Sequence, residues 1–589
     1  MAGACGCRGW KMQIATLSPC FSFLRPILPA TILMLGLGLA QPAQAATLFV
    51  APAPLGNNLV GISPNNCQAS SKPCKTVTYA LTLAQAGDTI SVAAGTYNFA
   101  NGETFPLTIK YSLTLTGAGA GSTFLDAMGR KQRVITISSG TFVTISGVTI
   151  MRGDVDNGST DPSDYGGGIL NDGLLLTLID SIVSGNKASS GGGILNYGGS
   201  TLILNNSTVS YNTAAGAGGI YNFGGKLTLI NSTVSNNIAR RAGGIWHGGT
   251  MTLINSTVSY NTVTGDGGGI FNICTGTTSS TATLINSTVS GNKAGTVGGG
   301  IVNFKDPSCS ATITFSNSTV TGNSATRDGG GIFNSGFNSG GTVKLKNTIV
   351  AGNTGNPGPN CNGTITSLGH NLSSDATCLG GTGDLNSPTP LLGPLANNGG
   401  PTQTHAPLPG SAAIDGVVPL ADCTDANNTI IATDQRGVAR PKGAACDIGS
   451  VEFQMFEYAV KFVCGRQAGP FGRSNPPFVA PGFYLTDINV HNPNGGPINF
   501  VKKFARALGN QKAGAVSRFF PATLKADEAF AVECLEIMSN FQSPLLSFVT
   551  GFVVFQSPQE LDIVTVYSAA AVPNGQVVTM HMERVPPRR

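Results

Sequence analysis

Residues 192–212 read GGILNYGGSTLILNNSTVSYN, and close copies of this stretch decide the fold of the chain. Its first part, Gly-Gly-Ile-x-Asn, occurs seven times between Gly166 and Asn334, once with His in place of Asn. The repeated isoleucines are Ile169, Ile194, Ile220, Ile245, Ile270, Ile301 and Ile332. Steps of 25, 26, 25, 25, 31 and 31 residues separate them. A period in this range indicates a stack of similar units, each of which contacts only its neighbours.

A second phrase, close to Leu-x-Leu-Ile-Asn-Ser-Thr-Val-Ser-x-Asn, follows each copy of the first. Its central valines are Val183, Val209, Val234, Val258, Val289, Val320 and Val350. The unit is rich in β-branched residues, Asn and Gly and has no apolar stripe of helix length, so it predicts a coil of short strands. Adjacent coils of such a stack lie about 4.8 Å apart. Equivalent side chains then form files along the axis, with the isoleucines and valines pointing inward.

This pattern resembles the right-handed parallel β-helix of the pectate-lyase-like superfamily. The Gly-Gly-Ile-x-Asn phrase resembles the repeats of polymorphic outer membrane proteins and of other bacterial surface β-helices. The resemblance implies an all-β fold with a right-handed, single-stranded parallel β-helix over residues 121–354. Residues 46–120 are predicted to form an N-terminal cap and the first coils. Within them, a short helix at 76–86 would cover the open sheet edge, and residues 87–92 would begin the first strand.

Asn recurs at three fixed places in each repeat, which predicts three files of amide side chains. The first file is Asn171, Asn196, Asn222, His247, Asn272, Asn303 and Asn334. The second file is Asp180, Asn206, Asn231, Asn255, Asn286, Asn317 and Asn347. The third file is Asn186, Asn212, Asn237, Asn261, Asn292, Asn323 and Asn353. Stacked amides bond to one another and to corner backbone groups, so we interpret these residues, His247 included, as structural.

The start of the chain predicts export. Residues 1–45 carry three basic residues and no acid, contain an apolar run at 27–40, and end in a signal-peptidase-like Ala-Gln-Ala before Ala46. A retained membrane anchor is the alternative. Removing this segment lowers the formal charge from +5 to 5 − 3 = +2, which does not favour nucleic-acid binding. No other long apolar run is present, so the mature chain is predicted to lack a transmembrane segment and to be extracellular or at the outer cell surface.

Ten cysteines remain after the signal peptide, and they fall in neighbouring pairs. This favours disulfides, as expected of an exported chain. The predicted pairs are Cys67–Cys74, Cys274–Cys309, Cys361–Cys378, Cys423–Cys446 and Cys464–Cys534. No Cys-x-x-Cys occurs among them, so zinc is not expected.

Two further parts follow the repeats. Residues 355–453 contain the phrases DQRGVARP at 434–441 and CDIGSVE at 446–452. These phrases resemble the choice-of-anchor domain of type Q, which precedes surface sorting signals in bacterial secreted proteins. No sorting signal follows here, so covalent anchoring is not expected. Alternating apolar runs at residues 458–464, 483–491, 498–504, 548–555, 563–567 and 577–582 predict a β-sandwich-like domain of unknown function over 454–589.

Acidic residues are too sparse in the repeats to predict a glycosidase. Residues 166–353 contain no Glu and five Asp, and no two acids fall at the same offset on adjacent coils. One acidic cluster, Asp154, Asp156, Asp161 and Asp164, has part of the spacing of a calcium loop, although a solvated polar loop is the preferred interpretation. Lys187 and Lys226 are candidates for a lyase base by residue type alone. No catalytic triad around His370, His491 or His581 can be identified from the sequence.

The sequence therefore favours a monomeric, exported, non-enzymatic β-helix that serves a structural, adhesive or glycan-contacting role. Glycans or other cell-surface components are the expected partners, and Tyr211, Tyr221 and Tyr260 are candidate exposed contacts. No cofactor is expected apart from calcium at the acidic cluster. The alternative is a polysaccharide lyase or glycoside hydrolase whose site is built from that cluster.

Overall fold

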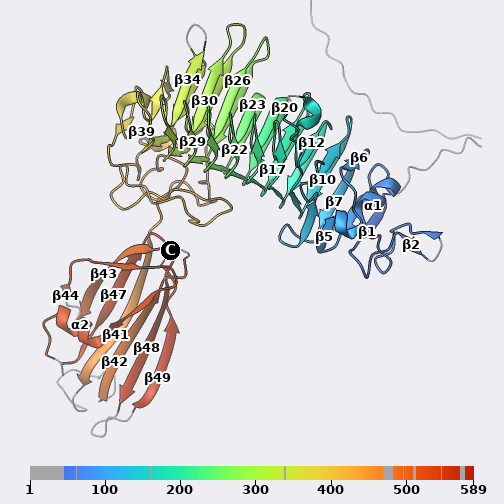
Figure 1. Cartoon of the computed structure of the whole chain (residues 1–589). Helices are drawn as coiled ribbons and strands as arrows, with labels where there is room; N and C mark the ends of the chain where they lie inside the picture. The colour runs from blue at the N-terminus through green and yellow to red at the C-terminus, as the bar shows by residue number, and fades with distance from the viewer. Residues whose placement is uncertain are drawn as a thin grey trace, which may run out of the picture. The chain divides into compact units, whose positions relative to one another are not determined.

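The computed structural model describes residues 45–60, 63–158, 161–336, 340–467, 482–494, 496–508, 513–544, 547–570 and 577–588. The predicted signal peptide lies outside these ranges except for its last residue. The described residues form a parallel β-helix and an antiparallel β domain, both visible in Figure 1. The predicted all-β fold, a parallel β-helix with a second β domain, is confirmed.

Three long stacks of parallel strands form the walls of the β-helix. The Leu sheet carries the Leu-x-Leu phrases and consists of β1 (Thr47–Val50), β4 (Thr89–Val92), β7 (Leu113–Gly117), β10 (Phe142–Ser146), β13 (Leu175–Ile179), β17 (Thr201–Asn205), β20 (Ile220–Ile230), β23 (Ile245–Ile254), β27 (Ser280–Ile285), β31 (Ala311–Ser316), β35 (Thr342–Lys346) and β38 (Thr366–Ser367). The Ile sheet carries the Gly-Gly-Ile-x-Asn phrases and consists of β6 (Leu107–Ile109), β9 (Ile135–Ile137), β12 (Ile169–Asn171), β16 (Ile194–Asn196), the first halves of β20 and β23, β26 (Ile270–Cys274), β30 (Ile301–Lys305), β34 (Ile332–Gly336) and β37 (Cys361–Asn362). Because β20 and β23 run through both stacks, the two sheets join into one of 20 strands.

The third wall and a narrow fourth one close each coil. The Val sheet carries the central valines and consists of β5 (Gly95–Asn98), β8 (Thr123–Asp126), β11 (Thr149–Met151), β14 (Ile182–Ser184), β18 (Thr208–Ser210), β21 (Thr233–Ser235), β24 (Thr257–Ser259), β28 (Thr288–Ser290), β32 (Thr319–Thr321), β36 (Ile349–Ala351), β39 (Leu372–Ser373) and β40 (Leu385–Asn386). A six-stranded stack consists of β15 (Lys187–Ala188), β19 (Thr213–Ala214), β22 (Ile238–Ala239), β25 (Thr262–Val263), β29 (Lys293–Ala294) and β33 (Ser324–Ala325).

The repeated residues stack in register, as the period predicts. Ile169 pairs with Ile194, which pairs with Ile220, and all seven repeat isoleucines are fully buried. The second glycine of each Gly-Gly lies against the next coil. A β carbon on Gly193, for example, would come within 2.7 Å of the carbonyl oxygen of Gly219. Steps of 31 residues arise where the Ile strand is five residues long and a loop, at 275–279 and again at 306–310, precedes the Leu strand. The disulfide Cys274–Cys309 joins the end of β26 to the second of these loops.

The N-terminal cap contains the predicted helix, but the first strand begins earlier than predicted. Helix α1 (Val77–Leu83) starts after Thr76, whose hydroxyl accepts from the backbone N–H of Tyr79. Glu103 also accepts from the N–H groups of Val77 and Thr78, which satisfies the helix start. Strand β1 precedes the helix and pairs with β4, so residues 87–92 are not the first strand. A two-stranded hairpin, β2 (Leu59–Val60) and β3 (Ser63–Pro64), and the 3-10 turn η1 (Phe99–Asn101) complete the cap. Three further 3-10 turns, η2 (Pro162–Asp164), η3 (Ala376–Cys378) and η4 (Leu420–Asp422), lie later in the chain.

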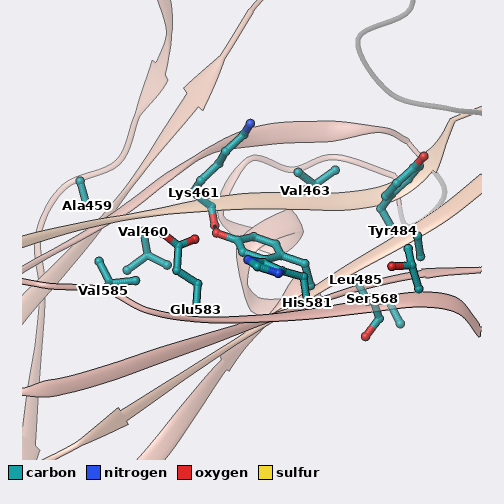
Figure 2. A pocket seen from close by; sticks show the side chains of 13 residues that line it. Ala459, Val460, Lys461, Val463, Tyr484, Leu485, Ser568, His581, Glu583 and Val585 are labelled. Atoms are coloured by element: carbon teal, nitrogen blue, oxygen red, sulfur yellow. Dashed lines mark hydrogen bonds between the residues drawn. The ribbon is translucent and has the colours of Figure 1, made fainter.

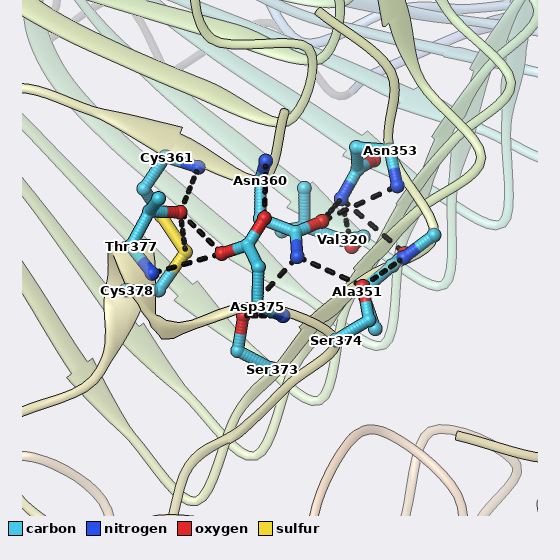
Figure 3. Close-up of a disulfide and its surroundings, with 11 residues drawn as sticks. Val320, Ala351, Asn353, Asn360, Cys361, Ser373, Ser374, Asp375, Thr377 and Cys378 are labelled. Carbon is cyan, nitrogen blue, oxygen red and sulfur yellow. Dashed lines mark hydrogen bonds between the residues drawn. A yellow bond between two sulfur atoms is a disulfide. The ribbon is translucent and has the colours of Figure 1, made fainter. Parts of the chain in front are cut away.

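The third Asn file forms a continuous ladder of buried amides. Each side chain donates from Nδ2 to the Oδ1 of the next Asn, as Asn237 does to Asn261 at 2.9 Å and Asn261 to Asn292 at 2.9 Å. The same Oδ1 also accepts from the backbone N–H of the file's Asn on the previous coil. The ladder ends beyond the repeat, where Asn353 donates to Asn360 beside the disulfide Cys361–Cys378 (Figure 3).

The second file has a different role, because all seven of its residues occupy left-handed corners with φ between 46° and 51°. Asn and Asp tolerate this conformation better than other residues with a side chain. Asn therefore occurs in the second file mainly because of the backbone conformation, and in the third file because of its hydrogen bonds.

Residues 391–452, which we call the return segment, fold back against the outer face of the Val sheet. Gln435 bonds through its amide to the hydroxyls of Thr257 and Thr288 on β24 and β28. Ser450 bonds to Thr288 and to Thr319 on β32. Apolar residues Ala413, Val417 and Ile448 pack with Ile349 and Leu372 of the same sheet. The identity of this part as a choice-of-anchor domain stays a prediction.

A buried ionic network holds the return segment together and explains its two phrases. Arg440 and Glu452 are fully buried and pair at 2.6 Å between Nη1 and Oε1. Arg436 pairs with the buried Asp434 at 2.7 Å, and the N–H of Glu452 donates to Asp434. Burial and the neighbouring Glu452 raise the pKa of Asp447 to about 7. The charged residues of the two phrases therefore form ion pairs and hydrogen bonds with one another.

The C-terminal domain is an antiparallel β-sandwich-like fold in which all six predicted strands are present. Its elements are β41 (Phe456–Gln467), β42 (Gly482–His491), β43 (Ile498–Ala507), β44 (Ala513–Val516), β45 (Phe520–Leu524), β46 (Ala529–Glu533), α2 (Cys534–Asn540), β47 (Val549–Ser557), β48 (Asp562–Ala570) and β49 (Val577–Arg584). The short strands β44 to β46 and helix α2 were not predicted. The core contains Tyr458, Phe462, Phe504 and Phe555.

All five predicted disulfides are confirmed, with Cα–Cα distances of 5.1 to 5.9 Å. Disulfides at this density indicate an oxidising, extracytoplasmic environment. Among the described residues, none of the helices has the length and apolarity needed to span a membrane.

Candidate functional site

The outer face of the Ile sheet carries a row of aromatic rings, which we call the aromatic stripe. Along each strand the Ile and Asn of the phrase point inward, so the residue between them and the residue after them point outward. The stripe consists of Tyr197, Tyr221, Phe223, Trp246, Phe271, Phe304 and Phe333. Ala217, Ala242 and Val302 pack against it from the adjoining turns and strands.

The rings of the stripe contact one another across coils. Trp246 stacks on Phe271 with centroids 4.9 Å apart, and Tyr197 stacks on Phe223 at 5.8 Å. Tyr221 meets Trp246 edge to face. Tyr197 and Phe223 remain 43% and 49% exposed, so the stripe is an organised apolar surface that is open to solvent at these two rings.

Tyr221 is the only one of the three predicted tyrosine contacts that belongs to this surface, and it is half-buried rather than exposed. Burial and the neighbouring Tyr165 raise its pKa to about 12, so its hydroxyl stays protonated at neutral pH. Tyr211 and Tyr260 are exposed, but they lie at left-handed corners that follow the Val strands. The three tyrosines therefore do not form one contact surface.

Gly248 takes the place of an aromatic residue on the outer face of the Ile sheet, one coil after Phe223. The two residues pair in register on β20 and β23. A β carbon at Gly248 would meet only the backbone oxygens of Ile273 and Asn222, at 3.5 and 3.9 Å. The position beside the ring of Phe223 is thus open, and a side chain can be introduced there without a clash.

His247 continues the first Asn file on the inner side of the same strand. Asn171, Asn196 and Asn222 donate successively along the axis, and Asn222 Nδ2 lies 3.0 Å from His247 Nδ1. His247 Nε2 lies 3.0 Å from the carbonyl oxygen of Thr281. These partners assign the neutral tautomer with the proton on Nε2. Burial lowers the pKa of His247 to about 4.

Acid sensitivity follows from this lowered pKa. Because the unfolded chain binds the proton near pH 6.5 and the folded chain only near pH 4, stability is complete above pH 6.5 and is lost as the pH falls. The loss from His247 amounts to about 3 kcal/mol at pH 4. We expect His247→Asn, the residue of the other coils, to flatten the pH dependence of thermal unfolding between pH 7 and 4. Buried His405 shifts in the same direction, so part of the slope should remain. An unchanged slope in the variant would refute this account.

The acidic cluster is divided among several partners. Asp154 pairs with Lys131 at 3.2 Å, and Asp156 pairs with Lys187 at 3.0 Å. The hydrogen bond from Lys187 is the main cause that lowers the pKa of Asp156. Lys187, which could not be placed from the sequence, therefore belongs to the cluster as a counter-ion.

The other two acids of the cluster also have local partners. Asp164 is buried and accepts from Asn157 at 2.8 Å, whereas exposed Asp161 accepts from the N–H of Ser163. Within the described part of the chain, no three His, Cys, Asp or Glu side chains are arranged to hold a metal ion. Calcium binding by this loop stays a prediction.

One pairing in the structure could not be identified from sequence spacing. His370 Nε2 lies 3.0 Å from Asp422 Oδ2, across 52 residues. No hydrogen bond among the described residues joins His370 to a Ser or Cys nucleophile, so a triad is not formed there. By contrast, Arg241 and Asp266 each lie four residues before a repeat isoleucine on adjacent coils, which predicts an ion pair of little energetic weight. The structure confirms this pair, with 3.9 Å between Nε and Oδ2.

The coil topology by itself defines the class of the fold, a parallel β-helix. Residues 60–241 match a family described as a protein of unknown function, DUF1565. No curated protein matches.

Three solved structures are similar to this chain. Pectate lyase Pel9A is 16% identical with a TM-score of 0.46, and the match covers 70% of this chain and 97% of the lyase. The Dettilon tailspike protein is 10% identical with a TM-score of 0.31, covering 87% and 94%. The enzymatically active domain of bacteriophage CBA120 tailspike protein 4 is 11% identical with a TM-score of 0.23, covering 87% and 68%. With TM-scores under 0.5, these likenesses support no conclusion about activity.

Proposed function

We propose that this chain is an exported, extracellular β-helix that binds glycans through the aromatic stripe and performs no catalysis on them. The observation that carries the proposal is the solvent-open pair Tyr197 and Phe223, continued by Tyr221 and Trp246. Aromatic faces and edges bury the C–H surfaces of a sugar while the tyrosine hydroxyl supplies a hydrogen bond at the rim. The stripe is rigid because each ring is held by its neighbours, so little side-chain entropy is lost on binding.

The arrangement of charges supports binding without catalysis. Hydrolysis of a glycosidic bond needs two carboxyl groups that face one sugar, and lyases of this fold class need acids that hold calcium. In the acidic cluster, Asp154 and Asp156 are instead neutralised by Lys131 and Lys187. The aromatic stripe itself contains no carboxylate.

Substitutions at the open end of the stripe test the proposal. We expect the mature protein to be retarded in affinity gels that contain mixed-linkage β-glucan or polygalacturonate. Phe223→Ala and Gly248→Thr should each weaken the retention about tenfold, because the first removes the exposed ring and the second fills the space beside it. Gly248 lies in a strand with room for a β carbon, so Gly248→Thr should fold normally.

Tyr211→Ala is the matched control, since Tyr211 is 65% exposed but lies outside the stripe. Equal retention of all four proteins would contradict the proposed surface. New reducing ends or unsaturated products in the same incubations would contradict the absence of catalysis. Fractionation of the producing cells tests export separately, and recovery in the cytoplasm would refute it.

A further inference from the structure

The C-terminal domain contains a strand whose outer edge is only partly paired. Strand β41 pairs with β47 along Phe456–Cys464 on one side. On its other side it pairs with β42 only at Gly465–Gln467. Below that point the two strands separate, and β48 and β49 continue the sheet of β42 without covering the edge of β41.

Hydrogen bonds identify which backbone groups of β41 face this open side. Val463 exchanges bonds with the hydroxyl of Thr486, and the carbonyl of Lys461 accepts from the hydroxyl of Tyr567 at 3.0 Å. At the other end, the carbonyl of Glu457 accepts from the N–H of Arg588. Because backbone groups alternate along a strand, Ala459 presents both its N–H and its C=O to the same side. No described residue bonds to either group there.

A cavity of about 510 Å³ lies beside this edge (Figure 2). Its opposite wall is formed by Val585, which follows β49, and by residues of β42, β48 and β49, among them Tyr484, Tyr567, Ala569 and His581. The ring of Tyr567 stacks on His581, and its hydroxyl donates to the carbonyl of Lys461. The cavity therefore combines a free strand edge with an apolar wall.

We propose that this cavity accepts an extended segment of a partner polypeptide, which adds as a strand to the edge of β41. The open edge between Glu457 and Val463 spans about 20 Å at about 3.4 Å per residue, the length of a typical strand. Alternate side chains of the added strand would pack on Ala569, His581 and Val585. Strand addition of this kind supplies affinity through main-chain hydrogen bonds and specificity through the side-chain wall.

Two residues define how the partner enters and which charge it carries. The hydroxyl of Tyr567 occupies the carbonyl of Lys461 in place of a strand N–H, so an incoming segment must displace it. Glu583 lines the cavity, and no ion pair is formed by it among the described residues. A basic residue of the partner beside Glu583 would supply the complementary charge.

The test is selection of a phage-displayed library of linear dodecapeptides on the mature chain, residues 46–589, followed by affinity measurement with the enriched synthetic peptides. Ala459→Pro removes the N–H that the added strand needs but leaves the bonds to β47 intact. We expect it to weaken binding about tenfold or more. Ala459→Ser keeps the N–H and should bind like the wild type. Tyr567→Phe frees the carbonyl of Lys461 and should tighten binding about threefold.

Circular dichroism and thermal melting check that each variant is folded. Failure to enrich any peptide on the wild type over Ala459→Pro would overturn the proposal. So would equal affinity of the enriched peptides for both proteins, or weaker binding by Tyr567→Phe. A concentration-dependent dimer that Ala459→Pro abolishes would overturn the choice of a foreign partner and assign the edge to a second copy of this chain.

Discussion

Asn261→Asp is expected to lower the thermal midpoint of the β-helix by about 5 °C at pH 7. Asn261 is fully buried and donates from Nδ2 to Asn292 and to the carbonyl of Val234. A carboxylate cannot donate, so Asn292 Oδ1 and the carbonyl of Val234 would lose their donor. The new carboxylate oxygen would also face these two acceptors. Each unmade bond to a buried polar group costs about 1–3 kcal/mol. At an unfolding entropy of about 2.1 cal/mol/K per residue, a loss of about 4 kcal/mol over the roughly 400 residues of the β-helix and return segment corresponds to about 5 °C.

The same replacement at Asn231 is the control for this prediction. Asn231 belongs to the second file, at a left-handed corner that Asp180 occupies in the first full repeat. Asp tolerates this conformation, and its side chain there is only half-buried. We expect Asn231→Asp to shift the midpoint by no more than about 2 °C. Partial recovery of Asn261→Asp at pH 4, where the protonated acid can donate one bond, would support the ladder. Equal shifts for the two variants would contradict it.

The repeated residues could be predicted because each coil sees the same environment. A period near 25 residues fixes the register, and register fixes which side chains point inward. The burial of the seven isoleucines and the pairing of the ten cysteines in residues 46–589 therefore followed from spacing alone. The different roles of the second and third Asn files did not, because a left-handed corner and an amide ladder both favour Asn.

The aromatic stripe was missed because it occupies the variable position of the phrase. Leu195, Tyr221, Trp246 and Phe271 share one file, but the sequence shows no single residue type there. The signal was available, since any residue between an inward Ile and an inward Asn must point outward. The predicted contacts were Tyr211, Tyr221 and Tyr260 instead. Of these, Tyr211 and Tyr260 lie at corners after the Val strands.

Contacts between distant segments could not be predicted from a local pattern. Asp422 and His370 are 52 residues apart, and Gln435 bonds to Thr257 across 178 residues. The Ser and Thr residues on either side of the central valines are typical of a solvent-exposed polar flank. From β24 to β36 that flank is instead covered by the return segment, so its hydroxyls bond within the protein.

Arg440→Met is expected to release the return segment while the coils stay folded. Both Arg440 and Glu452 are fully buried, and Arg440 also donates to the carbonyls of Asp447 and Gly449. Removing one member of a buried pair leaves an uncompensated charge, at a cost of about 3–5 kcal/mol. The coils have their own apolar core, so the loss should remain local. Thermolysin should then cut within residues 391–452 under conditions that leave the wild type intact, and mass spectrometry would locate the cuts.

The double variant Arg440→Met with Glu452→Gln separates charge from packing. Removing both charges leaves no unpaired ion, so the double variant should resist thermolysin better than Arg440→Met alone. Arg241→Met is the control, because Arg241 and Asp266 form an exposed pair at 3.9 Å whose loss should cost less than about 0.5 kcal/mol. Protection equal to wild type in Arg440→Met would show that the hydrogen bonds of Gln435 and Ser450 suffice to hold the segment. Cleavage throughout the coils would show instead that the return segment and the Val sheet unfold as one cooperative unit.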